Sequence, residues 1–251
     1  MRNTTFEEIY EMVTGFERTD LSQIRRFFIE KAINDHTIFH SLHSSNHPEE
    51  KNLKRLYLIT GSIAAGKSTI AYHLIRHLKL GKLPYVSSDT YYEAFFLKNG
   101  FQAGYEKARS LTMSILSKYE TNGISFVWET VLSKRQKWEY LRKLKDERYE
   151  LICFFVDVGK YDVAVSRSKK REMEGYHEVN KNFILDRYRK SMKTVEQLCS
   201  LCDKIIILNN SSSLKLAFYR DSSISYVNKE ALNYELAEEL KRYCQNVLFR
   251  D

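Results

Sequence analysis

Short apolar runs alternate with longer stretches of helical periodicity through most of this chain. The run LICFFV at 151–156 is apolar throughout, as expected for a strand that a sheet buries on both faces. The longer stretches carry apolar residues three and four positions apart, which is typical of amphipathic helices. The pattern predicts strands at 56–60, 84–87, 124–128, 150–156 and 204–208. It predicts helices at 67–79, 133–147, 161–173 and about 180–200, and a loop and a helix within 89–121.

This alternation predicts an α/β fold, in which helices cover both faces of a parallel sheet. Residues 6–42 instead read as helices, and a Ser-, His- and Asn-rich segment with Pro48 follows as a connector. We expect an N-terminal helical extension and linker at 1–50 and a main domain at 51–251, whose alternating core spans about 56–212. The C-terminal remainder, 213–251, is predicted to form strands at 214–219 and 224–228 and a helix at 229–248.

The composition favours a protein with a packed core and argues against a membrane-spanning or secreted one. Hydrophobic residues make up 43% of the 251 positions, which is enough for a packed core. No apolar run approaches the ~20 residues that a membrane-spanning helix needs, and the acidic, amphipathic N-terminus lacks the layout of a signal peptide. We therefore expect a cytoplasmic protein with no membrane partner. Two of the four cysteines form a CxxC at 199–202, which we interpret as ordinary buried thiols because no second pair accompanies them.

The net charge of +8 is unevenly distributed. Residues 134–148 carry seven basic and three acidic side chains, and residues 160–193 carry ten and five. This excess could attract nucleotides, nucleic acid or another polyanion. Solvated helix faces explain it equally well, so charge alone does not choose a partner.

A glycine-bracketed loop stands between the first predicted strand and the helix after it. The sequence GSIAAGKS at 61–68 fits the G-x-x-x-x-G-K-[ST] pattern of a phosphate-binding loop, and a strand and a helix flank it as that motif requires. Main-chain N–H groups of such a loop point at phosphate oxygens, and the helix adds its positive end. Lys67 would reach the β and γ phosphates, and the Ser68 hydroxyl would coordinate Mg²⁺. The predicted nucleotide-binding residues are Gly61, Ser62, Ala64, Ala65, Gly66, Lys67, Ser68 and Thr69.

Three acidic residues follow predicted strands at the sheet edge where this loop lies. Asp89 comes just after the second strand, and it could accept a proton from an attacking hydroxyl, help to hold Mg²⁺ or merely cap a helix. Glu129 ends the third strand, where it should face the ligand or metal unless it points to the surface. Asp157 ends the fourth strand and competes with Glu129 for the metal-assisting role, because open parallel sheets bind ligands beyond the carboxyl ends of their strands.

Two arginines form a further candidate pair. Arg167 and Arg171 are four residues apart, so they share one helix face. Arginines beside a γ-phosphate stabilise the charge that develops during phosphoryl transfer. A solvated basic helix is the equally weighted alternative.

Together these residues resemble the zeta-toxin-like kinases, a family of P-loop proteins. The resemblance rests on the loop at 61–68, Asp89, the ETVLS segment, the two arginines, GYHEVN, DRYRKS and LNNSS, and it covers about 56–212. It implies a P-loop NTPase fold, a three-layer sandwich, but it does not explain the N-terminal helical appendage at 1–50 or the segment at 213–251. It also implies a kinase that uses ATP and Mg²⁺, in a group that includes toxins acting on UDP-N-acetylglucosamine.

The resemblance implies a role for each matching position. Asp89 matches the aspartate that activates the substrate hydroxyl, and Glu129, followed by Thr130, matches residues near substrate and metal. Arg167 and Arg171 match arginines that stabilise the transferred phosphate. The remaining matches are Lys67 and Ser68 for ATP and Mg²⁺, His177 for the substrate, and Asn210 and Ser211 after the last strand.

Two positions depart from the family pattern. The usual proline of the G-x-H-x-V-P motif is Asn180 here. A substrate-binding glutamate of the sugar-phosphorylating toxins falls at Met113, whose side chain cannot accept a sugar hydroxyl's hydrogen bond as a carboxylate can. The second departure puts UDP-N-acetylglucosamine itself in doubt.

The sequence therefore favours a kinase that moves the γ-phosphate of ATP to a hydroxyl of a nucleotide sugar or nucleotide, acting as a toxin with a possible antitoxin partner. A polynucleotide or tRNA kinase is the second hypothesis, because the basic half could bind nucleic acid in a salt-dependent way. A nucleotide-switched ATPase or binding module is the third, and it predicts no phosphorylated product.

Overall fold

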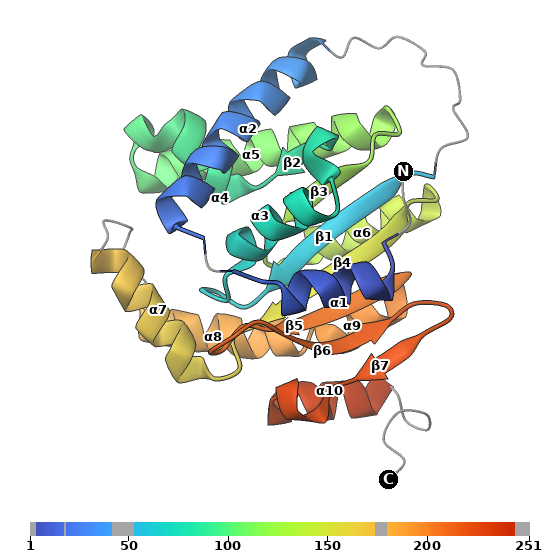
Figure 1. Ribbon diagram of the computed structural model, residues 1–251. Helices are drawn as coiled ribbons and strands as arrows, with labels where there is room; N and C mark the ends of the chain where they lie inside the picture. Colours follow the sequence, from blue (N-terminus) through green and yellow to red (C-terminus); the bar gives the residue numbers. More distant parts are fainter. Residues whose placement is uncertain (1–3, 18, 42–52, 174–179, 244–251) are drawn as a thin grey trace.

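The computed structural model describes residues 4–17, 19–41, 53–173 and 180–243 (Figure 1). Its centre is a seven-stranded sheet with the strand order β2-β3-β1-β4-β5-β6-β7. The first five strands along the chain are parallel, and the last two pair antiparallel at one edge. The strands are β1 (Arg55–Gly61), β2 (Tyr85–Val86), β3 (Phe126–Glu129), β4 (Glu150–Asp157), β5 (Lys204–Asn209), β6 (Lys215–Arg220) and β7 (Ser225–Val227).

Helices cover both faces of this sheet. Figure 1 shows α1 and α3 in front of the strands and α6 and α9 behind them. The molecule is thus the expected α/β three-layer sandwich, with every predicted strand present. The α-helices are α1 (Phe6–Thr14), α2 (Leu21–Ser41), α3 (Lys67–His77), α4 (Ser88–Tyr91), α5 (Phe101–Thr121), α6 (Arg135–Asp146), α7 (Tyr161–Met173), α8 (Lys181–Met192), α9 (Val195–Leu201) and α10 (Tyr234–Tyr243).

Two predicted helices differ from the structure. The helix expected at 180–200 is divided into α8 and α9, because the hydroxyls of Ser191 and Thr194 donate to nearby main-chain carbonyls at 2.7 and 2.6 Å and compete with helical bonding. The helix expected at 229–248 begins only at Tyr234, where the Asn233 side chain caps it by accepting from the Leu236 N–H at 2.8 Å. Residues 244–248 of that prediction lie outside the described part of the chain.

The N-terminal helices contribute to the core of the fold. A capping box between Thr5 and Glu8 starts α1, which buries Ile9, Met12 and Val13. Helix α2 lies along the β2 edge of the sheet and contacts α3 and α4. It brings the Phe28 ring to 4.1 Å from the Tyr85 ring, and the Asp35 carboxylate accepts from the Tyr85 N–H at 2.8 Å. That bond satisfies a donor of the edge strand, which would otherwise be unpaired.

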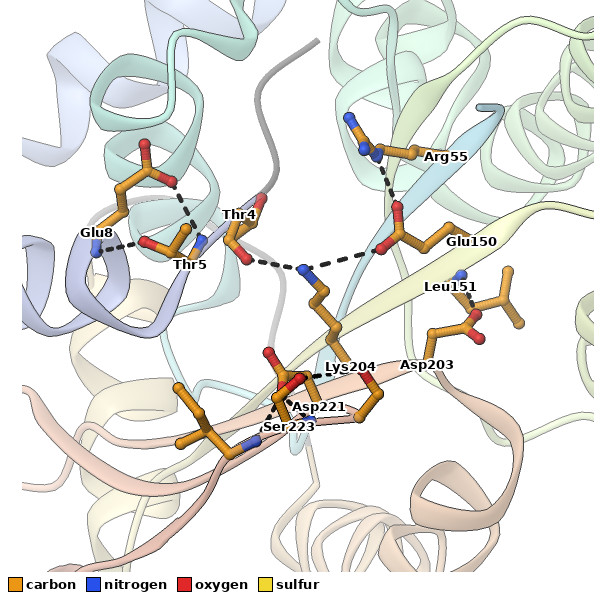
Figure 2. A network of polar contacts seen from close by, with 12 residues as sticks. Thr4, Thr5, Glu8, Arg55, Glu150, Leu151, Asp203, Lys204, Asp221 and Ser223 are labelled. Atoms are coloured by element: carbon orange, nitrogen blue, oxygen red, sulfur yellow. Dashed lines mark hydrogen bonds and ion pairs between the residues drawn. The ribbon is translucent and has the colours of Figure 1, made fainter. Parts of the chain in front are cut away.

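Buried charges join the amino ends of β1, β4 and β5, at the end of the sheet opposite the glycine-rich loop (Figure 2). Arg55 contacts Glu150 at 2.6 Å, and Lys204 lies 3.8 Å from the same carboxylate. Lys204 also donates to the main-chain oxygen of Thr4 at 2.9 Å, which ties the segment before α1 to the sheet. The network therefore supports the fold at a distance from the predicted site.

The cysteines show the expected structural character. Cys153, Cys199 and Cys202 are buried free thiols, and Cys244 lies outside the described residues. None of the described helices combines the length and the apolarity that crossing a bilayer would require.

Candidate active site

The glycine-rich loop joins the end of β1 to the start of α3. Gly61 has φ of +136°, and a Cβ there would lie 2.1 Å from the Val156 carbonyl oxygen. Gly66 has φ of +89° and caps α3, while Ala64 also adopts a left-handed φ of +56°. Alternation of this kind turns successive N–H groups to one side and forms a concave anion site at the positive end of a helix. The Ser62 hydroxyl is buried beside it with no hydrogen-bond partner among the described residues.

Lys67 lies at the centre of the charged groups predicted for the site. Its ammonium donates to the Ser62 carbonyl oxygen at 2.8 Å. Burial lowers the pKa of Lys67, the nearby carboxylates of Glu129 and Asp89 oppose that shift, and Arg171 lowers it further. The fold thus brings together residues from β1–α3, α4, β3 and α7 that are distant in sequence.

Glu129 is held by two hydroxyl groups. The Ser68 hydroxyl donates to one of its carboxylate oxygens at 2.9 Å, and the buried Tyr85 hydroxyl donates to the other. Its position follows from the parallel register, which pairs it with Ile59 of β1 just before the loop. Burial raises the pKa of Glu129, while Lys67 and the two hydroxyl donors lower it. The oxygen atoms of Ser68 and Glu129 are ligands of the type that Mg²⁺ prefers.

Asp89 lies in the first turn of α4, immediately beyond β2. Its carboxylate is exposed to solvent and accepts a hydrogen bond from the Tyr105 hydroxyl of α5. The side chain of Ser87 caps the helix by accepting from the Thr90 N–H at 3.5 Å, so Asp89 is not the capping residue. The Asp89 carboxylate is close enough to Lys67 to influence its pKa, and it remains accessible to a substrate.

Asp157 has a different environment from Glu129. It is fully buried at the end of β4, and the Asn233 amide donates to it at 2.6 Å. Burial raises the pKa of Asp157 to about 6. Of the two acids that could assist a metal at Ser68, Glu129 accepts a hydrogen bond from Ser68 itself. Asp157 instead accepts a hydrogen bond from Asn233, in the C-terminal part of the chain.

The predicted arginines lie on α7 beside the loop. Arg167 donates to the Ser211 carbonyl oxygen at 2.9 Å, and exposed Arg171 is close enough to Lys67 to influence its pKa. The side chain of Asn210 donates to the Ala65 carbonyl oxygen at 2.9 Å, which ties the segment after β5 to the phosphate-binding loop. His177, predicted to contact substrate, lies outside the described residues.

Several site residues were not predicted from the sequence. Tyr85 and Tyr105 orient the two carboxylates, and the Lys137 ammonium donates to the Thr130 hydroxyl at 2.5 Å and to the Val131 carbonyl oxygen at 2.9 Å. Lys137 follows Thr130 by seven residues on the next helix, a spacing that carries no signal without the fold. The sequence offered only the general excess of basic residues at 134–148.

Comparison with known families agrees with this geometry. A sequence profile of the zeta toxin family matches residues 40–223, which is most of the chain. The chain belongs to the zeta toxin family. This membership makes it a kinase, a phosphotransferase that uses ATP. A comparison with curated proteins found no match for this zeta toxin family member.

Solved structures show the same fold. One is from the PezAT chromosomal toxin–antitoxin system of Streptococcus pneumoniae, with a TM-score of 0.56 and 14% identity over 94% of this chain and 92% of that chain. Another is the AvrRxo1-ORF1:AvrRxo1-ORF2 complex with sulphate ions, with a TM-score of 0.61 and 14% identity over 97% and 78%. The same complex with ATP has a TM-score of 0.59 and 13% identity, over 100% of this chain and 80% of that chain. At these identities the likeness establishes the P-loop NTPase fold of this zeta toxin family member.

Proposed function

We propose that this protein transfers the γ-phosphate of ATP to a hydroxyl group of a small molecule, a nucleotide sugar or a nucleotide. The observation that carries the proposal is the gathering of Asp89, Glu129 and Arg171 around Lys67 at the mouth of the phosphate-binding loop. A cation, an acid open to solvent and a bonded serine–glutamate pair are the groups that phosphoryl transfer to an alcohol requires.

Each residue has a defined task in this proposal. The main chain of 61–69 and the Lys67 ammonium hold the triphosphate, and Ser68 with Glu129 would hold Mg²⁺ through oxygen atoms. Bound Mg²⁺ neutralises charge on the phosphate oxygens. Arg167 and Arg171 stabilise the phosphoryl group in transit, because α7 places them beside the loop.

Asp89 supplies the base. Its carboxylate accepts the proton of the acceptor hydroxyl as the oxygen of that hydroxyl forms a bond to the γ-phosphorus. The bond between the γ-phosphorus and the bridging oxygen breaks, so the products are ADP and a phosphate ester. The Tyr105 hydroxyl, bonded to the same carboxylate, fixes its orientation.

The identity of the acceptor belongs to the proposal as well. The family likeness supports a nucleotide sugar such as UDP-N-acetylglucosamine. Exposed Met113 on α5 supplies no carboxylate for a sugar hydroxyl, so nucleotides and NAD are included among the acceptors to be tested. The toxin–antitoxin description of the PezAT system supports a toxin role with an antitoxin partner, and the proposed place of action is the cytoplasm.

A screen with γ-labelled ATP tests this function directly. UDP-sugars, nucleotides, NAD and RNA would be offered with Mg²⁺, and a labelled product is expected with the wild-type protein but not with Lys67→Ala. Asp89→Asn should lose transfer while it retains ATP binding, because the loop that grips the triphosphate is unchanged. A cell extract that gives no labelled product would instead favour a nucleotide-switched binding module.

A further inference from the structure

A cavity of about 360 Å³ lies between the C-terminal end of α1 and the segment that follows β5. Val13 and Phe16 belong to its N-terminal wall, and Asn210, Ser213 and Leu214 belong to the opposite wall. This volume is within the range of small-molecule sites, which combine apolar walls with a few polar groups as this cavity does. The phosphate-binding loop accounts for the phosphates of a nucleotide, so the cavity is available for another part of the ligand.

Asn210 is shared by the cavity and the phosphate-binding loop. Its side-chain amide donates to the Ala65 carbonyl oxygen of the loop at 2.9 Å. A Cβ atom on Gly66 would lie only 2.5 Å from the same amide nitrogen. One side chain thus joins the cavity to the anion site, so a ligand bound to the loop can reach both.

The strand order determines which end of the nucleotide points toward the cavity. In the order β2-β3-β1-β4-β5, Asp89 and Glu129 lie at the ends of β2 and β3, on one side of β1 and its loop. Asn210 follows β5, on the other side of β1. The γ-phosphate must face the proposed base Asp89 for transfer to occur. The nucleoside end of the same molecule then extends away from Asp89, toward the cavity.

The N-terminal wall of the cavity is fixed to the rest of the fold. Val13 is buried in the core, and the Phe16 ring lies 4.4 Å from the His73 ring of α3. Because α3 begins at Lys67, the wall is attached to the helix whose positive end faces the phosphates. Both wall residues precede the segment 40–223 that the family profile matches, so family membership does not supply this wall.

We propose that the base of ATP binds in this cavity, against Val13 and Phe16 of the N-terminal segment and Leu214 after β5. This inference rests on the proposed binding of ATP by the loop and names the residues that recognise the rest of the nucleotide. A base has two flat π-faces that pack well against apolar and aromatic side chains, and polar edges that suit the polar groups after β5. The N-terminal extension is then part of the nucleotide site.

A packing gap filled by water is the simpler explanation for the cavity. A gap would not distinguish ATP from inorganic tripolyphosphate, which offers phosphates to the loop but has no base. Phe16→Ala removes the aromatic part of the N-terminal wall. Tyr10→Ala is its matched control, because Tyr10 is an exposed ring of the same helix region and is not among the residues that line the cavity.

A second variant fills the cavity instead of enlarging it. Ser213 is exposed at the cavity wall, so Ser213→Phe should fold normally and obstruct the base. This variant keeps the test decisive if Phe16→Ala does not fold. Ser222→Phe is its matched control, because Ser222 is an equally exposed serine in the turn between β6 and β7, at the far end of β6.

Calorimetric titrations without any acceptor test the proposal. A non-hydrolysable ATP analogue and tripolyphosphate, each with Mg²⁺, are titrated separately into the wild-type protein and each variant. We expect Phe16→Ala and Ser213→Phe to bind the analogue about 10-fold more weakly, the effect of a lost stacking contact, with the affinity for tripolyphosphate unchanged. Tyr10→Ala and Ser222→Phe should match the wild type with both ligands.

Two results would overturn the base pocket. Equal weakening of the analogue and tripolyphosphate would mean that the wall only supports the loop. Unchanged binding of the analogue by both cavity variants would mean that the base lies elsewhere, and the kinase proposal would be unaffected. Conversely, if the cavity variants lose the analogue selectively but the γ-labelled screen yields no phosphorylated product, the kinase proposal fails and the base pocket stands.

Discussion

The hydrogen bond from the Tyr85 hydroxyl to Glu129 can be removed by one substitution, and the stability lost then measures how strongly this contact holds the buried carboxylate of the site. Tyr85→Phe removes only the hydroxyl that donates to the buried carboxylate, and the ring can keep its stacking against Phe28. Ser68 then remains as the hydroxyl donor to Glu129. Because a hydrogen bond to a charged group contributes about 1.5–3 kcal/mol, the free energy of unfolding at neutral pH should fall by about that amount.

Tyr91→Phe is a matched control. Tyr91 is as deeply buried as Tyr85, and its hydroxyl donates to a neutral group, the Tyr85 carbonyl oxygen, at 3.2 Å. Loss of a neutral hydrogen bond should cost only about 0.5–1.5 kcal/mol. Kinase turnover should fall in Tyr85→Phe and change little in Tyr91→Phe, because only the first substitution loosens the carboxylate that binds Ser68.

The pH dependence separates charge from packing. Burial raises the pKa of Glu129 and the Tyr85 hydroxyl lowers it, so Tyr85→Phe raises it further. The stability lost in the variant should therefore be full above the pKa of Glu129 and should shrink as the pH falls and the carboxylate is protonated. Urea unfolding of wild type and both variants at pH 5 and pH 8 measures this difference. An equal loss at both pH values, or equal losses of stability and turnover in the two variants, would refute the reasoning.

Three further predictions follow from the described contacts. Burial lowers the pKa of Lys137 to about 8, opposed by Asp89 and assisted by Arg109, Lys134 and Arg187. KM for the acceptor should therefore rise between pH 7 and pH 9, because loss of the ammonium's proton weakens its hold on Thr130, a predicted substrate-binding residue; the rise should be absent in Lys137→Arg. Burial raises the pKa of Asp157 from 3.8 to about 6, so the protonated side chain favours the folded state at low pH. About 3 kcal/mol of the free energy of unfolding should be lost as the pH rises from 4 to 7. Asp157→Asn should remove this dependence of the free energy of unfolding on pH between 4 and 7 and keep kinase activity. Glu150→Gln removes the carboxylate that contacts both the Arg55 and the Lys204 cations and should cost about 3–5 kcal/mol in urea unfolding, with KM for ATP unchanged because the network lies at the far end of the sheet.

The amino-acid sequence by itself determined the architecture and the nucleotide end of the site. A strand buried on both faces must be apolar throughout, and a phosphate-binding loop must place glycines and a lysine at fixed positions between a strand and a helix. Both requirements act within short stretches of chain, so they can be read without knowledge of the fold. The placement of Asp89 and Glu129 after parallel strands extended this logic, because the carboxyl ends of such strands meet at one edge.

Only the tertiary structure decided which groups act on those carboxylates. Tyr85 reaches Glu129 across 44 residues, and Asn233 reaches Asp157 across 76, so the acid that bonds Ser68 could not be chosen from sequence spacing. The cations around Lys137 come from different helices, and each one alone resembles an ordinary surface residue. Local pattern fixes which way a strand or helix faces, but the pairing of side chains from distant elements depends on how those elements pack, and that information is spread over the whole chain.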